Sequence, residues 1–299
     1  MDFQPIVSLK KSKNILGSKI KILSPAKLNL YLNVLRKYPP EHKFYNYHYI
    51  ETILERISLF DEIYLEVIKK PDILFYTNSK DIDKKFNLCT KTISFLKDKF
   101  KINFGFKIFL NKKIPIGSGL GGGSSNAASI ILAMNKLLNL NLKKQELYKI
   151  GEEIGSDVNF FLSESRFAFA YGRGERVIPF DGKPLKHIII YPNTPLLTKE
   201  VYKFSNFKLT KFLSNVNIIY YAIKNKNLDL LKKVIFNALE KSALSLCKEL
   251  KDIKRFFAKL SIPVYLTGSG SALFTIGEHR VLFKSKIHKN LKIYTVETI

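Results

Sequence analysis

Alternating apolar and polar residues predict strands along much of the chain. In residues 102–110 every second residue is apolar from Phe104 to Leu110, which is the period of a half-buried strand. Residues 24–35 alternate in the same way, and their polar face carries Lys27 and Asn29. That face is either exposed to solvent or the floor of a polar site. Further strands are predicted at residues 50–58, 61–68, 72–77, 167–171, 187–191, 263–267, 272–277 and 292–296.

Apolar residues spaced three or four apart predict helices between these strands. One such helix spans residues 127–138, and further helices are predicted at residues 87–95, 142–154, 210–224, 228–236, 238–260 and 280–289. Strands and helices in this order predict a mixed α/β (α+β) fold. A length of 299 residues suits two domains. We place them at residues 1–182 and 183–299, with the junction at Lys183-Pro184.

A glycine-rich stretch, residues 115–125, separates the strand at 102–110 from the helix at 127–138. Five of the 15 glycines of the chain lie within residues 117–123. Successive amides in such a turn form a concave nest that binds anions, and a helix N-terminus adds to this preference. Ser124, Ser125 and Asn126 are expected to cap the helix. The arrangement of strand, glycine turn and helix predicts a phosphate site.

Other glycine motifs fit this stretch less well. The spacing Gly117-x-Gly119-x-x-Gly122 matches the dinucleotide fingerprint, but a second helix follows where that motif requires a strand ending in an acid. The P-loop needs a lysine at its end, and none occurs between Gly117 and Lys136. Protein-kinase markers and a Gly-x-Ser-x-Gly elbow are also absent from the sequence. A flexible linker is disfavoured because a helix follows at once.

The net charge of +25 suggests nucleic acid as one candidate partner, because a strongly positive protein attracts polyanions. However, 43 of the 50 basic residues are lysine and only seven are arginine, which is the residue that readers of phosphates and bases favour. The lysines are also spread along the chain. A solvated surface is therefore the preferred interpretation, and we expect no nucleic-acid partner.

Cysteine usage and hydropathy indicate the cellular compartment in which the protein is expected. Cys89 and Cys247 have no metal-ligand spacing, so a reduced cytoplasmic protein is expected. No apolar run approaches the roughly 18 residues that span a bilayer, and we expect no membrane association. The basic segment at residues 1–21 lacks the apolar core of a secretion signal.

Four stretches, in this order, resemble motifs of the GHMP small-molecule kinases. They are Pro25 to Leu30, the glycine-rich residues 115–125, Gly155 to Phe161, and Gly268 to Ser271. The resemblance implies a domain similar to ribosomal protein S5 domain 2, followed by a ferredoxin-like domain. It also implies an ATP-dependent kinase. The likeness is strongest to the branch whose acceptor alcohol carries a diphosphocytidyl group, which serves non-mevalonate isoprenoid synthesis.

The resemblance also implies the roles of individual residues. Lys27 would neutralise charge on the transferred phosphate, and Asp157, otherwise an ordinary turn residue, would accept the hydroxyl proton. Mg²⁺ would accompany ATP and touch a loop serine such as Ser124. Asn87 would lie beside the adenine, although an N-cap role is equally plausible for it. The remaining ATP-binding residues are Pro115, Gly117, Ser118, Gly119, Leu120, Gly121, Gly122, Gly123, Ser124 and Ser125.

The acceptor site is implied by the same resemblance. Its residues are Asn29, Tyr47, His48, Thr198, Tyr202, Gly268 and Ser269. The chain departs from the family twice. The Asp-Gly turn that precedes the Tyr-His pair is missing before Tyr47, and Asn159 stands where the family has proline. The alternatives are another kinase of the family and a nucleotide- or nucleic-acid-binding protein without catalysis. We expect a monomer or a weak homodimer.

Overall fold

The computed structural model describes residues 15–205, 215–277 and 291–299. By its internal contacts the chain divides into two compact units. The first unit comprises Met1–Ala26, Leu59–Ile114 and Gly121–Glu164, and the second comprises Lys27–Ser58, Pro115–Leu120 and Ser165–Ile299. The chain therefore passes between the units several times. The domain boundary between residues 182 and 183 stays a prediction.

The strands of the first unit follow the predicted alternation. Strand β3 (Ile73–Thr77) runs parallel to β4 (Gly105–Asn111), and β4 pairs antiparallel with residues 62–68 of β2 (His48–Ile68). Phe106 and Ile108 are buried in β4, whereas Phe109 is exposed. The prediction of two strands at 50–58 and 61–68 was wrong. Strand β2 continues through them, because no glycine, proline or asparagine interrupts residues 58–61.

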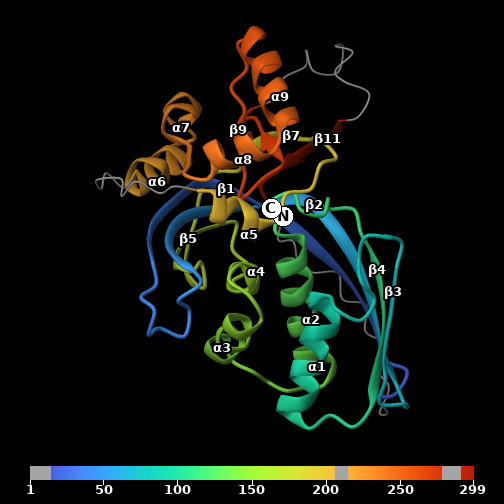
Figure 1. Cartoon of the computed structure of the whole chain (residues 1–299). Coiled ribbons are helices and arrows are strands. Elements are labelled where there is room, and N and C mark those ends of the chain that lie inside the picture. Colours follow the sequence, from blue (N-terminus) through green and yellow to red (C-terminus); the bar gives the residue numbers. More distant parts are fainter. Residues whose placement is uncertain (1–14, 206–214, 278–290) are drawn as a thin grey trace. The chain divides into compact units, whose positions relative to one another are not determined.

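Four helices complete the first unit: α1 (Leu88–Phe100), α2 (Gly122–Leu137), α3 (Lys144–Ile154) and α4 (Val158–Leu162). Helix α2 packs against the other three, and its buried residues include Ala127, Ile130 and Met134. Helices α1 and α2 lie on one side of strands β3 and β4 (Figure 1). Packing against these three helices therefore fixes the position of α2 within the first unit.

The start of α2 differs from the prediction. Ser124, Ser125 and Asn126 do not cap the helix, which begins two residues earlier, at Gly122. Its N-cap is Gly121, which adopts a left-handed conformation with φ 72° and offers no side chain to the amides of the first turn. Glycine allows this because it lacks the Cβ that would clash at positive φ. The N-cap residue therefore makes no side-chain hydrogen bond to the first amides of α2.

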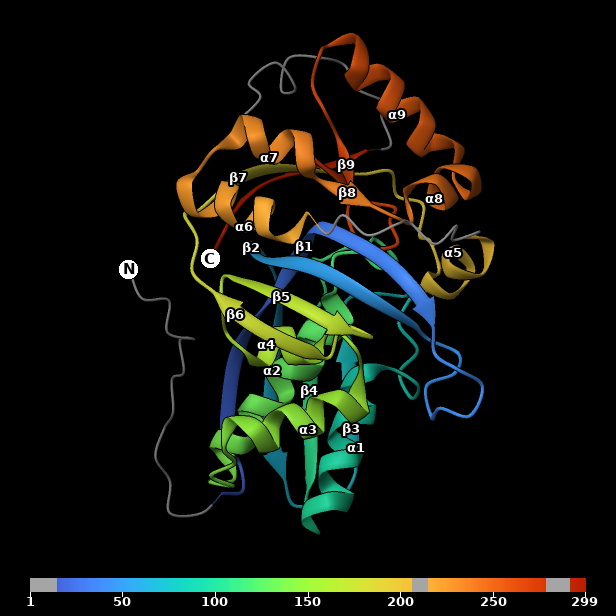
Figure 2. The same cartoon turned by 90° about the vertical axis from the view of Figure 1, so that its left-hand side faces the viewer.

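The second unit contains a four-stranded antiparallel sheet in the order β11-β7-β10-β9. Its strands are β7 (Lys186–Tyr191), β9 (Tyr265–Leu266), β10 (Leu273–Phe274) and β11 (Lys292–Glu297). Helices α5 (Thr198–Phe204), α8 (Glu240–Leu246) and α9 (Lys248–Lys259) contribute to the same hydrophobic core (Figure 2). The hairpin predicted around residues 268–271 is confirmed, since Leu273 pairs with Leu266.

Further strands and two helices belong to the described part of the second unit. Strands β5 (Phe167–Gly172) and β6 (Arg176–Phe180) form an antiparallel pair, and β5 also pairs with residues 50–55 of β2. Strand β1 (Lys19–Lys37) pairs in parallel with β8 (Phe236–Asn237). Helices α6 (Val216–Asn225) and α7 (Leu228–Val234) precede β8.

Two helix predictions in this unit need correction. The helix predicted at 228–236 ends at Val234, and Phe236 belongs to β8. The helix predicted at 238–260 is broken at Cys247, which is extended with φ −133° and separates α8 from α9. Strand pairing with β1 explains the first correction. The helix predicted at 280–289 and the start of the one at 210–224 lie outside the described residues.

A buried ion pair connects three segments of the second unit. Nε2 of His187 lies 3.0 Å from Oε1 of Glu55, and both side chains are completely buried. Nδ1 of His187 lies 2.9 Å from the carbonyl oxygen of Thr275, and Thr298 donates its hydroxyl proton to Glu55. Burial lowers the pKa of His187, but the Glu55 carboxylate and the Thr275 carbonyl raise it more, so the net pKa lies above its ordinary value.

Candidate active site

Lys27 is the centre of a buried polar network in the second unit. Its side chain is almost fully buried, and Nζ donates to Oδ1 of Asn29 and to the carbonyl oxygen of Gly119 over 2.7 Å. The amide of Lys27 also donates to the carbonyl oxygen of Leu120 over 3.0 Å. The polar face of β1 is therefore not exposed to solvent. Burial excludes the solvent-exposed interpretation of the alternation, and the role of this face as the floor of a polar site stays a prediction.

The first half of the glycine-rich stretch is locked against the hairpin turn at residues 268–271. Gly119 has φ 77°, and a Cβ there would lie 2.1 Å from the carbonyl oxygen of Thr267. Gly268 has φ 55°, and a Cβ there would lie 2.8 Å from the carbonyl oxygen of Gly119 and 3.1 Å from Nζ of Lys27. Such distances leave no room for a side chain. The structure thus brings together Lys27, Gly119 and Gly268.

Ser118 and Gly117 continue this contact. Ser118 is buried and donates to the carbonyl oxygen of Pro115 over 2.6 Å, closing the turn on itself. Gly117 has φ 62°, and its carbonyl oxygen accepts from the amides of Leu196 and Ser271. The stretch from Pro115 to Leu120 is therefore part of the second unit and is held by backbone hydrogen bonds.

The second half of the stretch, from Gly121 to Ser125, belongs to the first unit. A buried ion pair supports it, in which Nζ of Lys112 lies 2.6 Å from Oδ2 of Asp61. Oδ1 of Asp61 accepts from the amides of Lys113 and Ile114, and a Cβ on Gly122 would lie 2.8 Å from Nζ of Lys112. Burial lowers the pKa of Lys112. Sequence reasoning missed this pair, because Asp61 lies in the middle of β2 and Lys112 follows β4, about 50 residues later in the chain.

Asn87 is an N-cap. Its Oδ1 accepts from the amide of Thr90 over 3.0 Å, and the Thr90 hydroxyl completes a capping box. Its Nδ2 donates to the carbonyl oxygen of Asp83 over 2.8 Å. The predicted N-cap role of Asn87 is therefore confirmed, whereas its place beside the adenine of ATP stays a prediction.

Asp157 lies at the N-cap position of α4, half-buried, in the first unit. Its side chain makes no capping hydrogen bond, so the fold does not use the carboxylate to start the helix. Asn159, which replaces the family's proline, is buried, and a Cβ on Gly151 would lie 2.1 Å from its Oδ1. Gly151 thus allows α3 to approach α4 closely behind Asp157.

Two of the predicted acceptor residues meet across the second unit. The ring centroids of His48, at the start of β2, and Tyr202, on α5, are 5.3 Å apart. One helical turn before Tyr202, Oγ1 of Thr198 lies 2.9 Å from Oγ of Ser269. Helix α5 therefore carries both contacts on one face. Burial, together with the charge of Lys37, lowers the pKa of His48 and so favours the neutral form of its ring.

Tyr47 takes part in a different cluster. The rings of Tyr47 and Phe44 are 6.0 Å apart, and the guanidinium group of Arg173 lies 3.6 Å from the Phe44 centroid and 5.2 Å from that of Tyr47. The amide of Tyr38 donates to the carbonyl oxygen of Tyr47 over 3.1 Å, which closes the loop. Aromatic packing thus takes the place of the missing Asp-Gly turn, and His48 still begins β2.

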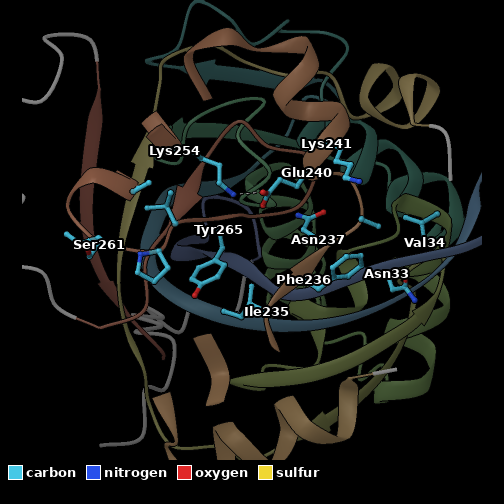
Figure 3. A pocket seen from close by; sticks show the side chains of 15 residues that line it. Asn33, Val34, Ile235, Phe236, Asn237, Glu240, Lys241, Lys254, Ser261 and Tyr265 are labelled. Atoms are coloured by element: carbon cyan, nitrogen blue, oxygen red, sulfur yellow. Dashed lines mark hydrogen bonds and ion pairs between the residues drawn. The ribbon is translucent and has the colours of Figure 1, made fainter. Parts of the chain in front are cut away.

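A separate cavity of about 1030 Å³ lies in the second unit between β1, β8, α8, α9 and the segment before β9 (Figure 3). None of the predicted site residues lines it. Several of its polar side chains are bonded within the protein: Glu240 pairs with Lys254, and Nδ2 of Asn237 donates to the carbonyl oxygens of Leu266 and Gly268. Tyr265 donates to the carbonyl oxygen of Lys232.

The described part of the chain contains no group of three or more His, Cys, Asp or Glu residues that could hold a metal ion by itself. Mg²⁺ that accompanies a nucleotide needs only one or two protein ligands besides the phosphates. Ser125 is engaged, because its Oγ lies 2.8 Å from Oγ of Ser24. Ser124, half-buried in the first turn of α2, is the hydroxyl of this pair that suits such a role.

Comparisons with known proteins agree with this geometry. The family model described as GHMP kinases N terminal domain matches residues 87–165, and the one described as GHMP kinases C terminal matches residues 219–292. The first range contains Asn87, the glycine-rich stretch and Asp157, and the second contains Gly268 and Ser269.

Individual relatives are similar over most of the chain. The 4-diphosphocytidyl-2-C-methyl-D-erythritol kinase of Caldanaerobacter subterraneus is 35% identical over 86% of this chain and 88% of its own length. That of Clostridioides difficile is 31% identical over 93% and 95%. A crystal structure of 4-(cytidine 5'-diphospho)-2C-methyl-D-erythritol kinase matches with a TM-score of 0.75 at 26% identity, covering 94% of this chain and 100% of the other.

A homoserine kinase from Cytophaga hutchinsonii shares the fold alone. It matches with a TM-score of 0.67 at 16% identity, over 97% of this chain and 96% of the other. The fold class predicted from the sequence is confirmed. No helix in the described ranges has the length and apolarity to cross a membrane.

Proposed function

Because the chain belongs to the GHMP kinase family, we propose that it transfers the γ-phosphate of ATP to the C2 hydroxyl of 4-diphosphocytidyl-2-C-methyl-D-erythritol. This reaction is a step of non-mevalonate isoprenoid precursor biosynthesis. The observation that carries the proposal is the similarity to kinases of this name, at 31–35% identity over most of both chains. The contact of the buried Lys27 ammonium group with Asn29 and Gly119 supports it.

The residues suit phosphoryl transfer, which asks mainly for positioning and charge stabilisation. The amides of the glycine-rich stretch and of the first turn of α2 bind the β-phosphate. The acceptor oxygen attacks the γ-phosphorus, the bond to the β-phosphate oxygen breaks and ADP leaves. The hydroxyl proton passes to the carboxylate of Asp157, and Asn29 orients the acceptor. Lys27 stabilises the charge on the transferred group.

Mg²⁺ is proposed as the companion of ATP, with Ser124 as the protein hydroxyl that holds it. When bound, it neutralises charge on the β- and γ-phosphate oxygens. We also propose a cytoplasmic protein, supported by two free, buried thiols, Cys89 and Cys247. The protein acts as a monomer or a weak homodimer, without a nucleic-acid partner.

A turnover assay with ATP and the cytidyl substrate tests the proposal. Formation of ADP and of the 2-phosphorylated product is expected only when both substrates are present. Activity on another small alcohol but not on this one would indicate a different kinase of the family. ATP binding without any turnover would indicate a nucleotide-binding protein without catalysis.

The glycine-rich stretch gives a first prediction. In Gly121→Val a branched side chain must adopt φ near 72°, beside the amides that bind the phosphate. We expect ATP binding to be lost in calorimetry while the circular dichroism spectrum is unchanged. Gly17→Val is the matched control, since Gly17 has φ 79° and nothing within 4 Å of its Cβ position. It carries the same strain and should bind ATP normally. Equal ATP affinity of both variants would contradict the assignment.

The acceptor site gives a second prediction. His48→Ala and Tyr202→Ala should each weaken binding of the cytidyl substrate about tenfold, because base stacking is worth about 1–3 kcal/mol and tenfold corresponds to about 1.4 kcal/mol. Tyr45→Ala, which removes an exposed ring (55%) of the nearby loop, should change nothing. The uridyl analogue should be a poor acceptor, since it leaves polar groups of the site unpaired. Equal phosphorylation of both analogues would mean that the cytosine is not recognised.

A further inference from the structure

Asn29 is held by a residue that no sequence motif pointed to, Thr52 on β2. Nδ2 of Asn29 donates to Oγ1 of Thr52 over 2.8 Å, and Oγ1 of Thr52 donates to the carbonyl oxygen of Tyr31 over 2.5 Å. Thr52 is only 1% exposed, so water does not compete for its hydroxyl group. The three groups form one continuous chain of hydrogen bonds with Lys27.

The direction of this chain is determined at both ends. The carbonyl oxygen of Tyr31 can only accept, so the single hydroxyl proton of Thr52 points toward it, and Oγ1 must accept from Asn29. At the other end the ammonium group of Lys27 can only donate, so Oδ1 is the Asn29 atom that faces it. Both ends therefore require the same orientation of the Asn29 amide.

The backbone of Asn29 is fixed as well. Its amide donates to Oγ1 of Thr267 over 3.0 Å, and Thr267 directly precedes Gly268 in the hairpin turn. The remaining freedom of Asn29 is rotation of its side-chain amide. An amide group carries two N–H donors, and only one of them points at Thr52.

We propose that Thr52 is a positioning residue for the phosphoryl transfer. Its hydroxyl group holds the Asn29 amide with Oδ1 toward Lys27, and it directs the second N–H of Nδ2 to the acceptor hydroxyl. Thr52 acts through Asn29 and Lys27. The role rests on the proposed function, because it is defined for the reaction that Asn29 serves.

Removing the hydroxyl group should release this orientation. In Thr52→Val the Lys27 ammonium group still faces Oδ1, but the N–H of Nδ2 has lost its acceptor, so the Asn29 amide can tilt about its single remaining side-chain contact. Misplaced reacting groups slow the chemical step more than they weaken binding. We therefore expect kcat to fall about tenfold, and KM for ATP to stay unchanged.

Two variants separate positioning from packing. Thr52→Val keeps the branched shape and loses the hydroxyl group, whereas Thr52→Ser keeps the hydroxyl group and loses a methyl group. Positioning predicts near wild-type kcat for Thr52→Ser and a tenfold loss for Thr52→Val. If Thr52 only packed the strand, the serine variant would be the slower one, and that order would overturn the proposal. Thr52→Cys, a weak donor, replaces valine with the same expectation if Thr52→Val does not fold.

A double-mutant cycle completes the test. In an Asn29→Ala background Thr52→Val should cause no further loss of kcat, because its route through Asn29 is gone. Additive losses would overturn the proposal. The wild-type enzyme is measured in parallel with ATP and the cytidyl substrate. No turnover by the wild type would overturn the proposed function and the Thr52 role together, whereas wild-type turnover with equal kcat for Thr52→Val would overturn the role of Thr52 alone.

Discussion

The Asp157→Asn variant is expected to lose about 10²–10⁴-fold in kcat, the range typical of general acid–base assistance. The substitution keeps the size of the side chain and removes the anionic acceptor for the hydroxyl proton. Affinity for ATP and for the cytidyl substrate should change much less. The measurement is steady-state turnover together with the binding affinity of each substrate.

The local structure around Asp157 makes this variant informative. Asparagine is as good an N-cap as aspartate, and Asp157 makes no capping hydrogen bond in any case. The melting temperature of Asp157→Asn should therefore equal that of the wild type. Normal turnover by this variant would reduce Asp157 to a turn residue.

Lys27 is the companion test for the same step. Lys27→Met keeps most of the buried stem and removes the charge that contacts Asn29 and Gly119. The same order of loss in kcat is expected. Unchanged kcat in Lys27→Met would indicate that the cation only holds the glycine-rich stretch in place.

Local features of the site could be predicted from the sequence because they depend on neighbouring residues. The alternation in β4 and the spacing in α2 predicted both elements that flank the glycine-rich stretch, and the cluster of glycines predicted the turn between them. The capping box of Asn87 is also local. The order of the motifs led to the family, which the comparisons confirm.

Long-range contacts could not be predicted in this way. Lys27 and Asn29 were recognised as polar residues on a strand, but their burial depends on Gly119, Thr52 and Thr267, which come from distant parts of the chain. Periodicity describes one element and not its neighbours. The contact of His48 with Tyr202 could be anticipated only through the family resemblance.

Two predicted helix boundaries were wrong for a related reason. Helical spacing continues across Cys247, and nothing local reveals that the chain is extended there. Residues 235–237 leave the helical pattern because Phe236 and Asn237 pair with Tyr31 and Leu32 of β1. Tertiary pairing thus overrides helix propensity at residues 235–237, and the structure shows no such pairing for the extended Cys247.

His187→Leu is expected to lower the free energy of unfolding by about 3–5 kcal/mol, the usual cost of leaving a buried charge without its partner. The carboxylate of Glu55 would remain completely buried, with the Thr298 hydroxyl group as a donor and no cation beside it. Urea denaturation of the full chain at pH 6 is the measurement. Lys254→Ala is the control, because it breaks the partly exposed pair with Glu240 and should cost at most about 1 kcal/mol.

The sign of the pH dependence follows from the two acceptors around the His187 ring. Both the Thr275 carbonyl and the Glu55 carboxylate require a proton on the nitrogen that faces them, so the folded state favours the imidazolium and raises the pKa of His187. The stabilisation is complete below the unfolded pKa of about 6.5 and is lost as the pH rises through the higher folded pKa. The double variant Glu55→Leu/His187→Leu should recover much of the single variant's loss and lack this pH dependence. Two outcomes would show that packing alone holds these strands together. One is an equal loss of unfolding free energy in the single and the double variant. The other is a wild-type unfolding free energy that rises between pH 6.5 and 8 relative to that of the double variant.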